Sequence, residues 1–105
     1  MVKSLLLLIN FTHDFTHSSG KMSGALEQIE QNNVINHTNE AILWCRRHQI
    51  PVVHMYTGFQ ENYIDLPIHS PIFKRVKEQG ALKMGSWGCQ IHEEIFTDPS
   101  DTIIP

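Results

Sequence analysis

The residues most able to do chemistry lie in a short polar run directly after an apolar one. Leu5 to Ile9 lead into Asn10, and residues 11–17 then repeat Phe-Thr-His on either side of Asp14. The amide of Asn10 can donate and accept hydrogen bonds, but it cannot act as a base near neutral pH. Asp14 is the one carboxylate of this run. It is either an acid that takes part in a site or a side chain that hydrogen-bonds the following backbone.

Histidines and cysteines give weaker signals for chemistry. His13 and His17 are four residues apart, a spacing that suits a metal only on a helix, and directly after a strand we expect no helix. His54 falls within a predicted strand, where a buried histidine with hydrogen-bond partners is the expectation. Cys45 and Cys89 have no zinc-binding spacing, and Cys45 is expected to be a small buried hydrophobe on a helix.

The elements that position these residues follow from the hydrophobic pattern. Residues 4–10 are a continuous apolar run, which is typical of a strand buried on both faces in a parallel sheet. Residues 25–48 have helical periodicity, with a weak point at Asn32 and Asn33, and residues 52–56 form a second strand. This order predicts a right-handed βαβ unit. The predicted apolar stripe of the helix consists of Val34, Ile35, Thr38, Ala41, Ile42 and Cys45.

The second half of the chain is predicted to contain a helix and the start of a strand. Ser70 and Pro71 indicate a helix start, Gly80 its end, and Ile72, Phe73 and Val76 its apolar face. Residues 57–69 and 83–90 are predicted loops, 91–96 a short helical turn, and a strand begins at residue 102. Ligands of such sheets bind beyond the carboxyl ends of the strands, where residues 10–14 and 56–59 are predicted to lie.

Composition excludes several classes of protein. The chain has 105 residues, a net charge of −3, 41% hydrophobic and 18% charged residues, which predicts one globular domain and argues against nucleic-acid binding. No apolar stretch is long enough to span a membrane, and the N-terminal run is too short for a signal peptide. We expect a cytoplasmic protein whose two cysteines are reduced.

Four segments together resemble the isochorismatase-like cysteine hydrolases. They are "INFTHDF", "LWCRRHQIPVVHM", "KMGSWGCQIHEEI" and "DPSDTIIP", in the order and at the spacing found in the first half of a family domain. The resemblance implies a three-layer α/β fold with a parallel, Rossmann-like sheet, of which residues 1–105 would be the N-terminal part. It also implies hydrolysis of an amide or enol-ether-like bond in a small molecule, without a cofactor.

The resemblance also assigns positions to the site. Asn10 stands where the family has its catalytic Asp, and the chain ends before the positions of the family's Lys and nucleophilic Cys. Cys89 stands where the family usually has Ala. Asp14, Phe15 and Trp87 are the candidate substrate-binding residues, with backbone hydrogen bonding by Asp14 and core packing by the two aromatic residues as the alternatives. The metal cluster that nicotinamidases carry after the second strand has no counterpart here, so no metal and no nicotinamide substrate are expected.

These observations leave two main functional hypotheses. The first is a member or fragment of the hydrolase family that is inactive as given, because Asn10 cannot take the proton of a thiol and the Lys and Cys are absent. The second is a non-catalytic oligomerisation or interaction module, since half a domain exposes a sheet edge and apolar surface, and we expect a homo-oligomer on that ground. A flavodoxin-like binding domain ranks last, because "NFTHDFTH" contains no glycine to grip a phosphate.

Overall fold

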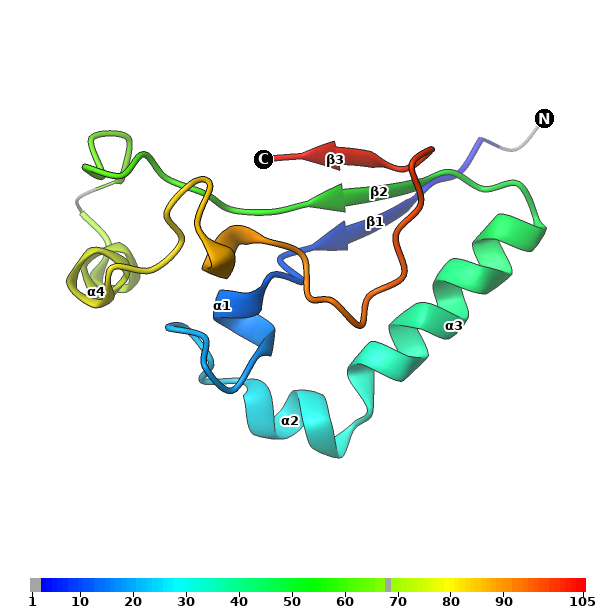
Figure 1. Ribbon diagram of the computed structural model, residues 1–105, viewed down its shortest axis with the longest axis horizontal. Coiled ribbons are helices and arrows are strands. Elements are labelled where there is room, and N and C mark those ends of the chain that lie inside the picture. The colour runs from blue at the N-terminus through cyan, green and yellow to red at the C-terminus, as the bar shows by residue number, and fades with distance from the viewer. Residues whose placement is uncertain (1–2, 68) are drawn as a thin grey trace.

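Three parallel strands form the sheet of the protein. The computed structural model describes residues 3–67 and 69–105, and its strands are β1 (Leu6–Ile9), β2 (Val52–Met55) and β3 (Thr102–Ile104) in the order β1-β2-β3 (Figure 1). Leu6 lies opposite Val52 in the first parallel pair, and Val53 lies opposite Thr102 in the second. The predicted parallel α/β fold is therefore confirmed, including the strand that begins at residue 102.

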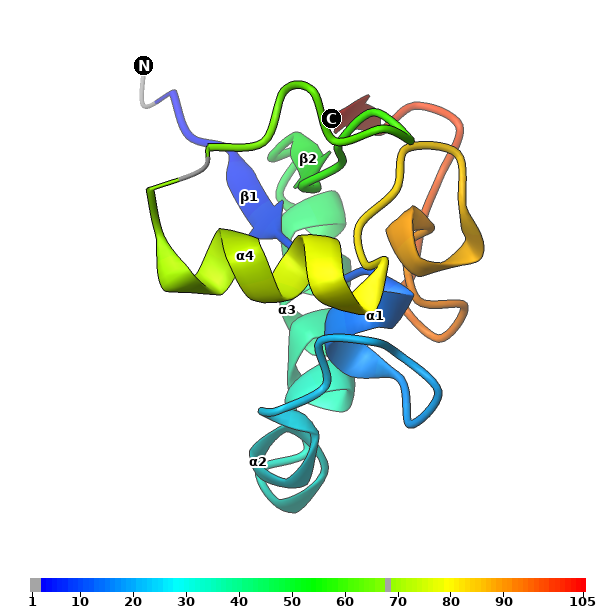
Figure 2. The same ribbon diagram turned by 90° about the vertical axis from the view of Figure 1, so that its left-hand side faces the viewer.

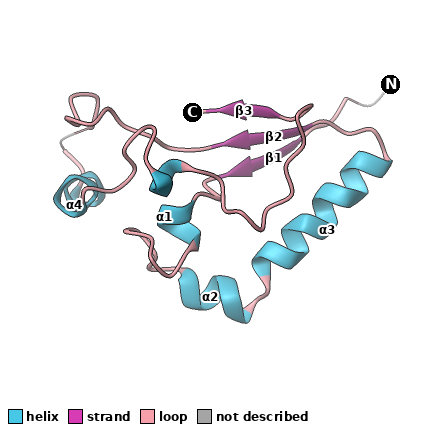
Figure 3. Cartoon of the chain, in the orientation of Figure 1, coloured by secondary structure: helices cyan, strands magenta, loops and turns pink. Residues whose placement is uncertain are grey.

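The helix predicted over 25–48 is divided where the sequence is weakest. It consists of α2 (Leu26–Gln31) and α3 (Val34–Arg47), which runs beneath the strands (Figures 1 and 3). Asn33 separates the two with a φ of 54°, a left-handed conformation that asparagine tolerates better than most residues. Among residues 3–67 and 69–105, no helix has the length and apolar character needed to cross a membrane.

One hydrophobic core lies between α3 and the sheet. Ile42 and Cys45 of α3 pack with Leu8 and Val52 of the strands and with Ile95 of the loop before β3. Ile42 is fully buried, so the centre of the predicted stripe is correct. The core follows from the crossover, which lays one face of α3 against one face of the sheet.

The predicted burial pattern of α3 is wrong at two positions. Ala41 is exposed, and Asn39 is buried although it was expected to lie off the apolar stripe. The Asn39 amide donates to the carbonyl of Glu94 at 2.7 Å, and its oxygen accepts the N–H of Phe96 at 2.8 Å. Burial of this polar side chain is possible because both hydrogen-bonding groups are satisfied.

No element among the described residues covers the other face of the sheet, so the prediction that β1 is buried on both faces is wrong. Leu5, Leu7 and Ile9 are 57%, 43% and 56% exposed. Ile9 lies opposite Met55, which lies opposite Ile104, and paired residues point to the same face. The described residues thus form two of the three expected layers, the sheet and the helices on one side of it.

A second core lies beyond the carboxyl ends of the strands. There α4 (Pro71–Gln79) crosses in front of the sheet, as Figure 2 shows, and Val76 packs with Phe59, Tyr63 and Leu82. The predicted start of this helix and its end at Gly80, with a φ of 64°, are confirmed. Ile72 is 57% exposed and does not belong to the buried face.

Two short segments differ from the prediction. A helical turn, α1 (His13–Thr16), follows β1 directly, where no helix was expected. The short 3-10 helix η1 (Trp87–Cys89) lies in a predicted loop, whereas residues 91–96 are not helical. Thr12 forms an antiparallel bridge with Ile91, and this contact places the segment 87–93 beside α1.

Candidate functional site

Asn10 lies at the carboxyl end of β1 and joins this strand to the loop after β2. Its N–H donates to the carbonyl of Met55 at 2.8 Å, and its φ of 62° turns the chain away from the sheet. Its Oδ1 accepts the Thr57 N–H at 3.0 Å and the Thr57 hydroxyl at 2.9 Å. An amide oxygen has two lone pairs, so both are used within the protein. The sequence predicted that residues 10–14 and 56–59 both lie beyond the carboxyl ends of their strands. The contact between Asn10 and Thr57 confirms that the two strand ends meet at this edge of the sheet.

Cys89 also contacts Thr57. Its Sγ is 3.5 Å from the Thr57 carbonyl oxygen, and the residue is buried. Burial raises the pKa of the Cys89 thiol; a hydrogen bond with Ser86 lowers it in part, and the charge of Asp14 raises it further. The thiolate is the nucleophilic form, so this cysteine is not an activated nucleophile.

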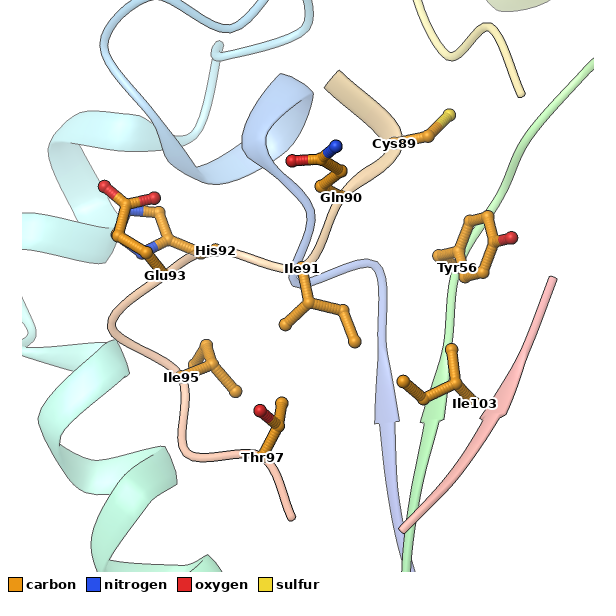
Figure 4. Close-up of a pocket in the computed structure, with 9 residues that line it drawn as sticks. All are labelled: Tyr56, Cys89, Gln90, Ile91, His92, Glu93, Ile95, Thr97 and Ile103. Atoms are coloured by element: carbon orange, nitrogen blue, oxygen red, sulfur yellow. The ribbon is translucent and has the colours of Figure 1, made fainter. Parts of the chain in front are cut away.

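A hollow of about 380 Å³ opens beside Cys89. Figure 4 shows the side chains of Ile91, Tyr56 and Ile103 around the same space, whereas His92 and Glu93 lie on the far side of the loop. This volume falls in the range of roughly 300–1,000 Å³ that small-molecule pockets occupy. The full lining is Tyr56, Cys89, Gln90, Ile91, His92, Glu93, Ile95, Thr97 and Ile103.

Asp14 holds two loops together through backbone hydrogen bonds. Its Oδ2 accepts the N–H of Leu82 at 2.7 Å, its Oδ1 accepts the N–H of Lys21 at 3.0 Å, and the residue is buried. The carboxylate also lies directly against the Cα of Gly88, where an added Cβ would overlap it. Asp14 thus bonds to backbone, but at residues 7 and 68 positions away and not at the directly following residues, where the alternative prediction placed its partners.

The two aromatic candidates lie in different places. Phe15 packs against the core beneath α4, whereas Trp87 is 43% exposed and stacks on His13 with the ring centroids 4.1 Å apart. Neither of them, nor Asn10 or Asp14, is among the residues that line the hollow. The four candidates therefore do not line this hollow, and their roles in catalysis and substrate binding stay predictions.

The unexpected helical turn of α1 brings histidines together. The rings of His13 and His17 lie 5.7 Å apart, and His92 approaches both. Even so, among the residues that the structure describes, no group of three or more His, Cys, Asp or Glu side chains is arranged to hold a metal ion.

A buried charge cluster that sequence reasoning missed fastens β3 to the rest of the fold. Both carboxylate oxygens of Asp101 accept hydrogen bonds from Arg46, at 2.8 and 2.9 Å, and Oδ2 also accepts from His54 Nε2 at 3.0 Å. The bond from Arg46, with a smaller contribution from His54, lowers the pKa of Asp101 to about 2. His54 is buried as predicted, but among the described residues its Nε2 has a hydrogen-bond partner and its Nδ1 has none. The turn "DPSD" marked the position of Asp101, but no local signal indicated its partners.

Comparisons with known proteins agree with this architecture. A structure of a cysteine hydrolase from Pseudomonas syringae pv. phaseolicola 1448A matches with a TM-score of 0.66 and 11% sequence identity. The match covers 96% of this chain but 45% of the hydrolase, so the chain spans less than half of that protein, and the likeness at this identity concerns the fold. None of the curated protein sequences matches significantly. The family model described as the isochorismatase domain matches residues 4–105, and the chain therefore belongs to the isochorismatase domain family.

Proposed function

We propose that these 105 residues form an isochorismatase-type domain portion that does not by itself hydrolyse small-molecule amides or enol ethers. The observation that carries the proposal is Asn10 at the carboxyl end of β1. The family resemblance implies a thiol nucleophile whose proton is taken by a carboxylate at this position. An amide cannot take that proton near neutral pH, and the oxygen of Asn10 is already bonded twice to Thr57.

Cys89 does not act as the nucleophile in this proposal. Its burial and the charge of Asp14 raise the pKa of the thiol, and its neighbour Thr57 offers a carbonyl oxygen, not a base. Without a base or a nearby positive charge, a thiol is a weak nucleophile near neutral pH. The hollow beside Cys89 can still accept a small molecule without chemistry following.

The first experiment is an assay of the chain on a panel of small amides, with Asn10→Ala and an Asn62→Ala control at an exposed position. We expect no turnover by the wild type. Turnover that Asn10→Ala abolishes and Asn62→Ala preserves would overturn the proposal, because position 10 would then take part in catalysis as asparagine.

A second variant, Asn10→Asp, restores the carboxylate of the family. Both bonds from Thr57 can be made to a carboxylate, so the change is expected to lower the free energy of unfolding by about 1 kcal/mol or less. We expect no activity from this variant of the 105-residue chain. In a longer form that carries the family's Lys and Cys, the restored base is expected to raise the hydrolysis rate by about 10²–10⁴.

A second function is favoured by the uncovered face of the sheet. Leu5, Leu7, Ile9, Met55 and Ile104 are all exposed, and β1 stands at the end of the described strand order. An open strand edge beside an apolar face favours association between chains. We propose on this ground that the chain forms a homo-oligomer.

Sedimentation equilibrium at micromolar concentration tests this association. Leu7→Lys places a charge on the uncovered face, whereas Ile64→Lys places the same charge at a position that is 75% exposed and lies in the loop between β2 and α4. We expect an oligomer for the wild type and for Ile64→Lys, and dissociation for Leu7→Lys. A folded wild-type monomer at this concentration would refute the proposal.

A further inference from the structure

Three histidines meet beside Trp87 at the junction of α1 and the segment 87–93. The ring centroids of His13, His17 and His92 lie 5.5 to 5.8 Å from one another, and we call this group the three-histidine cluster. The indole of Trp87 lies flat on His13, with 4° between the ring planes, and meets His17 edge-on at 4.9 Å.

The hydrogen bonds of the cluster distinguish one histidine from the other two. His13 Nδ1 lies 2.9 Å from the carbonyl oxygen of Trp87, and its Nε2 contacts the carboxylate of Glu93. Both partners are acceptors, so both ring nitrogens must donate, and an imidazole that donates twice carries a positive charge.

The other two histidines have the opposite arrangement. Nδ1 of His17 accepts the N–H of Ser19 at 3.0 Å, and Nδ1 of His92 accepts the N–H of Glu94 at 3.1 Å. A nitrogen that accepts a hydrogen bond carries no proton, so these two rings are neutral.

We propose that a charged His13 is a latch that fastens the segment 87–93 to α1, and that acid opens this latch by charging His17 and His92. Opening would release Gln90, Ile91 and their neighbours, which form one wall of the hollow. The proposal does not depend on whether the chain hydrolyses any substrate.

The surroundings of His13 are suited to a buried positive charge. Its side chain is 5% exposed, and the charge is balanced by the Glu93 carboxylate and by the face of the Trp87 indole. The hydrogen bond with His13 is the largest of the causes that lower the pKa of Glu93 to about 2. Glu93 therefore remains charged in the mildly acidic range, and its titration is not what opens the latch.

Protonation of His17 or His92 would weaken the cluster in two ways. Protonation of Nδ1 in His17 or His92 would point a donor at the backbone N–H that it now accepts, so that hydrogen bond is lost. It would also add a second positive charge less than 6 Å from His13. Other carboxylates also lie near the cluster. Glu30 of α2 and Glu94 line a second hollow together with His92, and the carboxylate of Asp14 is turned to the amides of Lys21 and Leu82.

Trp87 offers a direct optical readout of the latch. Trp44 is the second tryptophan of the chain and lies on α3, so Trp44→Phe leaves Trp87 as the single indole. In this background we expect the emission of Trp87 to rise and shift to the red on mild acidification from pH 7, as the ring leaves His13 and meets water.

The deciding variant is His17→Asn combined with His92→Asn. An asparagine oxygen can accept the backbone N–H two residues ahead, as both histidines do, but it cannot be protonated. We expect the acid transition to disappear in this double variant and to persist in His37→Asn, which changes an exposed histidine on α3. A transition that survives the double variant, or no transition in the parent, would overturn the proposal.

Nitrogen NMR of the imidazole rings tests the charge assignment separately. Near neutral pH we expect both ring nitrogens of His13 to be protonated, and His17 and His92 to be protonated at Nε2 alone. Glu93→Gln removes the balancing negative charge, and in this variant we expect only one ring nitrogen of His13 to be protonated. A neutral His13 in the wild type would overturn the latch in favour of ordinary packing. If added zinc ions shifted the signals of all three rings together, the cluster would be a metal centre and the latch would likewise be overturned.

Discussion

Asp101→Asn removes the negative charge that fastens β3 to β2 and α3 while it preserves the size of the side chain. The carboxylate is 2% exposed and receives hydrogen bonds from Arg46, from His54 and from the Asp98 N–H. An asparagine can accept at one atom only, so one bond of the bidentate Arg46 pair is lost and a buried arginine contact is left without its counter-charge.

The magnitude follows from the pKa of Asp101. A fall from 3.8 to about 2 corresponds to about 2 kcal/mol at neutral pH, since one pKa unit is worth ~1.4 kcal/mol. For a domain of this size, such a loss would lower the melting temperature by roughly 10 °C. Urea unfolding of the wild type and of Asp101→Asn at pH 7 measures the difference directly.

The pH dependence gives the sharper test. Because the folded-state pKa is lowered, the stability contributed by Asp101 is fully present above about pH 4 and is lost as the pH falls toward about 2. The difference between wild type and variant should therefore shrink as the pH falls from about 4 toward about 2. Asp65→Asn is the matched control, because this exposed carboxylate accepts one backbone N–H, that of Gln60. A difference that is constant with pH, or no larger than that of the control, would refute the reasoning.

Three further changes test the packing and the chemistry of the site. Gly88→Ala should destabilise the fold by about 2 kcal/mol or more in urea unfolding, because its Cβ would overlap the Asp14 carboxylate, whereas Gly24→Ala meets no atom within 4 Å and should have little effect. Ile42→Ala should cost about 2–5 kcal/mol of unfolding free energy, because the side chain is fully buried, and a loss below 1 kcal/mol would contradict the assigned core. Cys89 should react with iodoacetamide more slowly in the folded chain than in urea, because burial raises the pKa of its thiol, and rapid alkylation of the folded chain would identify an activated cysteine.

The sequence by itself determined the features that depend on neighbouring residues. Apolar runs with the period of a strand or a helix predicted β1, β2, α3 and α4, and Asn33 and Gly80 marked a break and an end because both adopt left-handed backbone conformations. The order of these elements predicted the parallel sheet, since a crossover helix returns the chain in the same direction. The motifs also indicated the family and the unusual Asn10.

Tertiary structure decided what those residues touch. Asn10 bonds to Thr57 across 47 positions, Asp101 to Arg46 across 55, and His13 to Glu93 across 80. Such pairs depend on strand register and on how loops cross, which no local pattern encodes.

The two largest errors have the same origin. The apolar run of β1 predicted burial on both faces. A strand's composition shows only what it can bury, and in the described part of the chain no element lies against one face of β1. The helical turn at His13 begins directly after Thr12, which pairs with Ile91 nearly 80 positions away, a contact that the local pattern does not indicate. The sequence therefore identified which residues form the edge of the sheet, while only the folded chain decided which of them share a cavity, a charge or a hydrogen bond.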